Sequence, residues 1–155
     1  MRALALIGGG LVAMGLAWPS QMLVISDETG AVRWRVPVAD GAEVVLRYTN
    51  SVYLAPTWER FVVHGGRLHL RDISSTREAV LEYNRLAPPY QVAGGRVTAP
   101  VSGIVLDGYT LRVGARGHPI LRVGSAVLPL YQAGEGAGLR VAIRRAPRLF
   151  TWLKR

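Results

Sequence analysis

Short segments in which apolar and polar residues alternate recur along the chain at intervals of about ten residues. Turn residues separate these segments, and the 18 glycines and 9 prolines of the sequence suit turns better than helices. Because successive side chains of a strand point to opposite faces, a period of two predicts strands with one face in a core. A chain of 155 residues is long enough for one such core. We therefore expect an all-β fold, a single antiparallel sandwich or small barrel of short strands.

Most of the expected strands are joined as hairpins, because the turns between them are short and rich in glycine. One segment is ambiguous. Ser75 and Glu78 have the spacing of a helix capping box, but residues 79–83 are equally compatible with a strand. Strands are expected at 21–26, 31–36, 67–73, 90–93, 96–98, 103–106, 109–113, 120–123, 126–130 and 139–143, with two more within 43–64.

The most informative stretch is residues 43–63, in which two segments of strand character flank a polar loop that ends in proline. On the second segment Glu59 has the same parity as Phe61 and Val63, so the three side chains point to one face. A carboxylate that points toward a core must be paired or hydrated. The nearest donors by sequence precede it, which predicts a polar cluster of Arg47, Tyr48, Asn50, Ser51 and Glu59.

Two interpretations of this cluster remain open. In the functional one, the cluster is a recognition surface for a small polar ligand or for a loop of a partner protein. In the structural one, Asn50 and Ser51 satisfy the amides of the turn, and Glu59 accepts hydrogen bonds that lock the hairpin. Replacing Glu59 with Gln separates the two, because only the structural interpretation requires a change in melting temperature.

The N-terminal segment predicts export. Arg2 is followed by an uncharged run over residues 3–18, the order of charge and apolar residues found in secretory signals. Residues 1–18 are therefore expected to form an apolar helix that serves as a signal peptide or membrane anchor, followed by a β domain at 21–143. Either role places the domain in the periplasm or on the outer face of the cytoplasmic membrane. The chain has no cysteine, which excludes disulfides and thiol chemistry.

The basic charge is concentrated at the C-terminus. The formal net charge is +9, and residues 144–155 contain several basic residues and no acid. We interpret this segment either as a tail that binds an anionic membrane surface or as a solvated terminus. Elsewhere arginines alternate with apolar residues, as on the solvated face of a strand, so we expect no nucleic-acid partner. The tail residues singled out are Arg144, Arg145, Arg148, Trp152, Lys154 and Arg155.

Enzyme signatures are absent from the sequence. There is no Gly-x-Ser-x-Gly elbow, and the single lysine, Lys154, is terminal, which excludes a Ser-x-x-Lys centre. The three histidines lack the spacing of a helical zinc motif. The run Gly134-Glu135-Gly136-Ala137-Gly138 imitates a dinucleotide loop but follows no βαβ unit, so we interpret it as a linker. We expect no catalytic residues, no metal and no cofactor.

The chain resembles one family, the domain-of-unknown-function eighteen-fifty group of small exported bacterial proteins encoded beside TAXI-type TRAP transporters. The most specific block runs from Arg47 to Val52 and continues with Pro56 and Glu59, similar to the family's Tyr-x-His-Ser-Val, Pro and Glu pattern. Asn50 stands where the family usually has His, and Asn does not titrate. A second block, residues 118–124 with the following apolar residues 128–130, is similar to the family's closing hairpin.

The resemblance implies a non-enzymatic extracytoplasmic accessory protein for a TAXI-type TRAP solute transporter. Its partners would be the membrane subunits of the transporter or the solute-binding protein. The alternative function is a stand-alone periplasmic module that binds a small ligand. A deep pocket with converging polar groups would favour this alternative.

Overall fold

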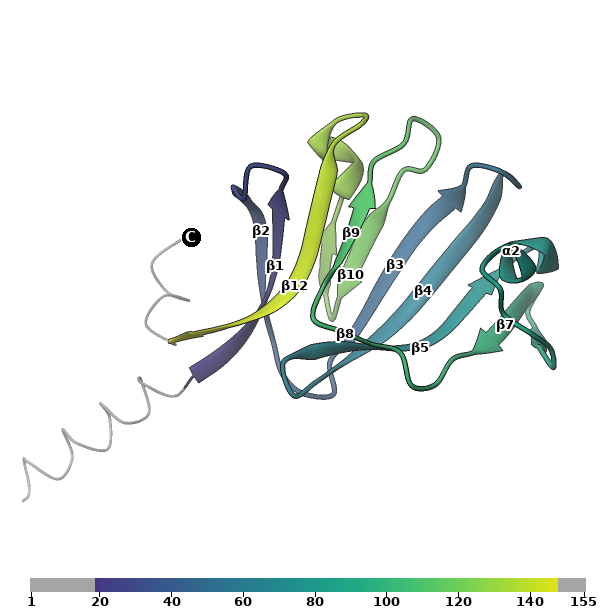
Figure 1. Cartoon of the computed structure of the whole chain (residues 1–155), viewed down its shortest axis with the longest axis horizontal. Helices are drawn as coiled ribbons and strands as arrows, with labels where there is room; N and C mark the ends of the chain where they lie inside the picture. The colour runs from purple at the N-terminus through teal and green to yellow at the C-terminus, as the bar shows by residue number, and fades with distance from the viewer. Residues whose placement is uncertain (1–18, 148–155) are drawn as a thin grey trace, which may run out of the picture.

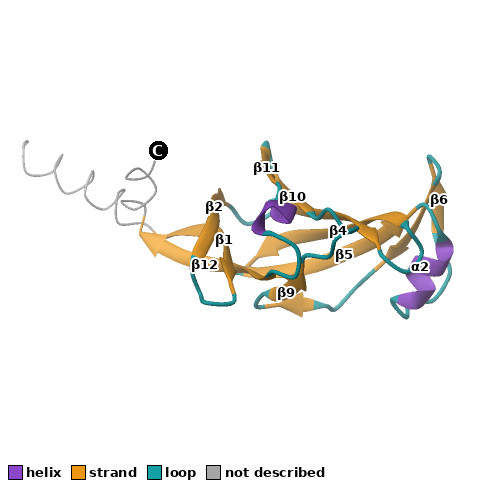
Figure 2. Cartoon of the chain, turned by 90° about the horizontal axis from the view of Figure 1, so that it is seen from above, coloured by secondary structure: helices purple, strands orange, loops and turns teal. Residues whose placement is uncertain are grey.

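The computed structural model describes residues 19–147, which form two antiparallel sheets around a shared core. Figure 1 shows both sheets, and Figure 2 shows how little helix the described chain contains. The expectation of an all-β fold is confirmed. The strands belong to two separate sheets, and neither sheet closes on itself among the described strands. The apolar helix expected at 1–18 lies outside the described residues.

The smaller sheet has four strands and the larger has eight. In the smaller sheet the order is β2 (Val32–Val38), β1 (Pro19–Asp27), β12 (Gly138–Pro147) and β9 (Tyr109–Arg112). The larger sheet runs through β11 (Ala126–Leu128), β10 (Ile120–Val123), β3 (Glu43–Asn50), β4 (Ala55–His64), β5 (Arg67–Ser75), β7 (Arg96–Pro100) and β6 (Gln91–Ala93), and β8 (Val105–Leu106) pairs with β5.

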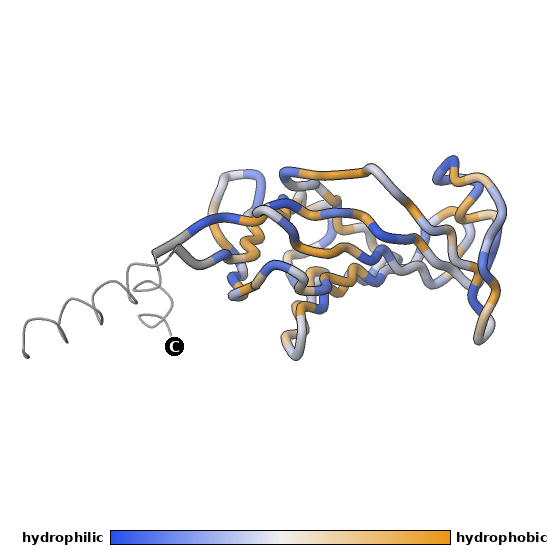
Figure 3. Tube along the Cα trace, turned by 90° about the horizontal axis from the view of Figure 1, so that it is seen from below, coloured by the Kyte–Doolittle hydropathy of each residue, from blue (hydrophilic) through white to orange (hydrophobic). Residues whose placement is uncertain are grey.

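The core follows from the alternation along the strands, which Figure 3 shows as changes between apolar and polar residues. Alternate residues of each central strand turn inward, and both sheets contribute to one apolar cluster. Burial of this cluster is the main favourable term that holds the sheets together. Its largest fully buried members are Phe61, Leu23, Ile25, Leu68, Leu81, Leu121, Leu130 and Leu139.

The hairpin expected over residues 103–113 is wrong. Strand β8 pairs with β5 of the larger sheet, whereas β9 pairs with β12 of the smaller sheet, so the chain crosses between sheets at Asp107 and Gly108. A Cβ atom on Gly108 would lie 2.7 Å from the carbonyl oxygen of Val141. This glycine therefore permits a close backbone approach at the crossover. In the sequence, the pair Asp107-Gly108 looks the same as the turn of a β-hairpin.

The ambiguous segment is a short helix, α2 (Glu78–Tyr83), at the end of the molecule away from Pro19 and Pro147 (Figure 1). The predicted capping box is wrong, because the residue before the helix is Arg77, and no side chain caps it. Ser75 is still part of β5, and its hydroxyl donates to the Pro56 carbonyl at 2.9 Å. A 3-10 turn, η1 (Leu130–Ala133), shortens the strand expected at 126–130.

The last strand is longer than expected and changes the boundary of the basic tail. Strand β12 continues to Pro147. Within it, Arg144 pairs with Met22 of β1 and Arg145 pairs with Gln21. These two arginines therefore belong to the sheet and not to a free tail. The other tail residues, Arg148, Trp152, Lys154 and Arg155, lie outside the described residues. Within residues 19–147 no helix has the length and hydropathy needed to cross a membrane.

Candidate functional site

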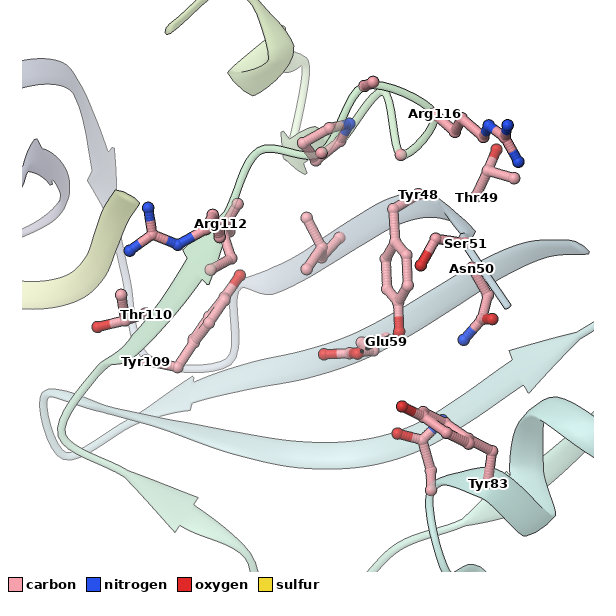
Figure 4. Close-up of a pocket in the computed structure, with 17 residues that line it drawn as sticks. Tyr48, Thr49, Asn50, Ser51, Glu59, Tyr83, Tyr109, Thr110, Arg112 and Arg116 are labelled. Carbon is pink, nitrogen blue, oxygen red and sulfur yellow. Dashed lines mark hydrogen bonds between the residues drawn. The ribbon is translucent and has the colours of Figure 1, made fainter. Parts of the chain in front are cut away.

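A pocket of about 680 Å³ lies between the inner face of the larger sheet and the edge strand of the smaller one. Strands β3 and β4 form its floor, β9 and the following loop form one wall, and the end of α2 forms the other (Figure 4). The lining residues are Leu46, Tyr48, Thr49, Asn50, Ser51, Glu59, Tyr83, Asn84, Tyr109, Thr110, Leu111, Arg112, Gly114, Ala115, Arg116, Gly117 and Pro119.

Tyr48 and Glu59 form a hydrogen-bonded pair on the pocket floor. Glu59 lies opposite Leu46 in the β3–β4 ladder, one diagonal step from Tyr48, and the tyrosine hydroxyl donates to Glu59 Oε1 at 2.8 Å. The predicted orientation of Glu59 is confirmed, since it shares the inner face with Phe61. The pairing of β4 with β5 has a bulge here, but the extra residue is Arg71 on β5, so the alternation along β4 is preserved.

Burial dominates the electrostatics of this pair. The low-dielectric surroundings raise the pKa of Glu59, and the hydrogen bond from Tyr48 only partly opposes this. The pKa of Tyr48 is also raised, first by burial and then by the charge of Glu59. All ten acidic side chains of the protein lie within residues 19–147, and Glu59 forms no ion pair with any described basic residue. The carboxyl group therefore has no countercharge in the described part of the chain.

Tyr109 of β9 adds a second buried hydroxyl to the site. Its ring stacks on Phe61 with the centroids 5.3 Å apart, which fixes the side chain over the floor. The hydroxyl is buried and has no hydrogen-bond partner within the described residues. Burial raises its pKa, and the charges of Glu59 and Tyr48 raise it further, so the three groups share one electrostatic environment. Figure 4 shows Glu59 between the two tyrosines.

The structure divides the predicted polar cluster. Asn50 is buried at the pocket edge, where Oδ1 accepts from the backbone amides of Val52 and Tyr53, each at 3.0 Å. This Asx turn agrees with the structural interpretation of Asn50. Ser51 is exposed at the rim and donates no hydrogen bond to Glu59. Placing Arg47 beside Glu59 was wrong, because Arg47 has the opposite parity and lies on the outer face of the sheet.

The sequence did not identify Tyr109 as a site residue. Its parity with Leu111 and Val113 indicated that it points inward, but the expected hairpin placed its strand beside β8. Only the crossover to the smaller sheet brings Tyr109 over Phe61. Packing between the two sheets is a long-range contact, and a local pattern does not specify it.

The arrangement combines one carboxyl and two phenol groups in a partly apolar cavity. Such groups donate and accept hydrogen bonds, which suits recognition of a polar head group. No cluster of three or more possible metal ligands occurs within residues 19–147. The chain matches no protein-family model, and no curated protein or solved structure is significantly similar to it. The function is therefore inferred from the geometry of the site.

Proposed function

We propose that the protein binds a small molecule in the pocket between β3, β4 and β9. The observation that carries this proposal is the unpartnered hydroxyl of Tyr109 next to the Tyr48–Glu59 pair. Buried polar groups in proteins are nearly always hydrogen-bonded, and leaving one unpaired costs about 1–3 kcal/mol. A ligand that supplies the missing partner removes this cost, so the free energy of binding contains the recovered hydrogen bond.

The site favours a ligand with an apolar body and a polar head. The head group would accept from Tyr109 and donate to Glu59, a combination that a hydroxyl group provides. An ammonium group would also donate to Glu59 and would supply the countercharge that the carboxyl lacks, but it would not accept from the Tyr109 hydroxyl. Leu46, Leu111 and Pro119 line the pocket and provide contacts for the apolar body.

The test is a binding screen on the full chain with a library of small alcohols and amines, read by ligand-observed NMR. For any alcohol that binds, Tyr109→Phe should weaken binding by about tenfold, the equivalent of one hydrogen bond. Glu59→Gln should weaken it further, because the carboxylate accepts more strongly than the amide. The control variants Tyr131→Phe and Glu135→Gln make the same changes away from the pocket.

Two results count against the proposal. If neither pocket variant changes the affinity of a bound compound, the compound occupies another site. If Glu59→Gln lowers the melting temperature and Tyr109→Phe leaves binding intact, the carboxyl has the structural role alone.

A second candidate function is supported by the resemblance to the eighteen-fifty group. The block that carries the resemblance contains Tyr48, Asn50 and Glu59, which line the same pocket. In this function the protein is an exported accessory of a TAXI-type TRAP transporter, in the periplasm or anchored to the membrane, and the ligand would be connected with solute uptake. Co-purification of the full chain with transporter subunits from membranes would test this function. A negative result leaves the binding screen unaffected, so the two functions can fail separately.

A further inference from the structure

A second concave surface lies on the outer face of the larger sheet, opposite the pocket. This outer groove, of about 770 Å³, is lined by side chains from β3, β4, β7 and β10 and by Val127 of the edge strand β11. Its charged lining consists of the exposed side chains of Arg47, Arg96 and Arg122 and of one acid, Glu43. The groove shares strands β3 and β4 with the pocket but none of its lining residues.

The three arginines lack acidic partners, although an arginine beside them is well paired. Arg60 bridges to Asp72 and also lies 3.7 Å from Glu43, so its charge is balanced within the sheet. None of the three groove arginines is within ion-pair distance of any acid in residues 19–147, a range that contains every acidic side chain of the protein. The three arginines therefore outnumber Glu43, the one acid of the groove lining, and the groove keeps a net positive charge.

The register brings these charges together. Arg47 lies opposite Ile120 and Arg122 lies opposite Val45 in the β3–β10 ladder, so the two arginines are diagonal neighbours on one face. Like charges at this spacing repel each other. A bound anion would offset this repulsion, because it attracts both guanidinium groups. Arg96 extends from β7 over Trp58, with its guanidinium carbon 3.8 Å from the ring centroid. This cation–π contact holds one cation at the floor of the groove.

From this geometry we infer that the outer groove docks an extended, acidic segment of a partner protein. Charge complementarity with the arginines requires a negatively charged partner. Its elongated form follows from the extent of the lining, which reaches from Val127 of β11 across β10, β3 and β4 to Arg96 of β7. Apolar floor residues, Val45 and Ile120, would contact alternate side chains of the segment. A flat lipid surface would reach the exposed arginines but not the indole under Arg96.

The test measures fluorescence anisotropy of a labelled peptide of alternating Glu and Ser residues, titrated with the full chain at low salt. The double variant Arg47→Gln/Arg122→Gln should weaken binding at least about tenfold, since it removes two charge-assisted contacts. The control Arg35→Gln/Arg140→Gln makes the same change in net charge on exposed positions of the smaller sheet. It should weaken binding less than threefold or so, as expected for long-range charge alone.

The outcomes decide the proposal. Equal losses in the two double variants would show non-specific attraction to a basic protein and overturn it, as would the absence of binding by wild type. Vesicles of phosphatidylglycerol provide a further arm: if the groove variant loses vesicle binding but keeps peptide binding, the surface recognises lipid and the proposal fails. Addition of peptide should also shift the indole N–H resonance of Trp58. Binding that leaves this resonance unchanged places the peptide elsewhere.

Discussion

The two faces of the β3–β4 hairpin differ sharply although they belong to the same strands. Arg47 and Tyr48 are consecutive, as are Trp58 and Glu59, and each pair is divided between the outer groove and the inner pocket. On the inner face a carboxyl group is buried without a countercharge, and its pKa is raised. On the outer face the guanidinium groups are exposed to water. The parity of a residue along its strand therefore determines whether its side chain is buried or exposed to water. Burial in turn determines the pKa of an ionisable group.

The division has a chemical consequence. On the inner face, a buried hydroxyl group that lacks a hydrogen-bond partner would recognise a ligand through a few directed hydrogen bonds. Such bonds favour a specific small molecule. Exposed charges act over a longer range and are screened by salt, which favours association with a charged chain. Binding to the two faces should therefore differ in salt dependence.

The largest difference between the faces should appear in stability. Phe61→Ala removes a core side chain that is 2% exposed and should cost about 3–5 kcal/mol of unfolding free energy. Its neighbour Val62 points to the outer face, and Val62→Ala should cost less than about 1 kcal/mol. Urea denaturation of both variants measures the contrast. Similar losses would mean that the two faces are buried to the same extent.

The Asx turn at the pocket edge should have the next largest effect. Asn50→Ala removes the acceptor for two backbone amides and should cost about 1–2 kcal/mol. Asn50→Asp keeps an acceptor at the same position and should retain most of the stability. If both variants unfold at the wild-type urea concentration, the side chain does not support the turn.

The pH dependence of stability should report the buried carboxyl. Because the folded-state pKa of Glu59 is raised above its unfolded value, the folded state binds the proton more tightly. The contribution of Glu59 to stability is therefore fully present below the unfolded pKa and is lost as the pH rises through the folded pKa. Wild type should lose stability relative to Glu59→Gln over this window, as measured by urea denaturation across pH. A parallel pH profile for the two proteins would mean that Glu59 titrates as a solvated group.

The smallest effect is expected from changes on the outer face. Arg47→Gln should change unfolding free energy by less than about 0.5 kcal/mol, because the side chain is exposed and unpaired. It should also leave the pKa of Glu59 nearly unchanged, whereas Tyr48→Phe should raise that pKa by removing a donor to the carboxylate. Carbon-detected NMR titration of the Glu59 carboxyl compares the two variants. A larger shift in Arg47→Gln would indicate that the faces are electrostatically coupled.

Local patterns predicted much of the fold because strand parity is a property of the backbone. The alternation along β4 correctly oriented Glu59 toward the core, and the Asp27–Gly30 turn joins β1 and β2 as expected. The predicted helix cap failed because of a contact with another strand. Ser75 bonds to Pro56 on the neighbouring strand and therefore remains in β5.

The all-β class, the orientation of Glu59 and the polar turn at Asn50 were predictable, since each depends on residues close together in the chain. The crossover at Gly108, the stacking of Tyr109 on Phe61 and the contact of Arg96 with Trp58 follow from tertiary packing. These contacts depend on which strands become neighbours. That choice is made by packing of the whole core, whose long-range contacts no short segment encodes.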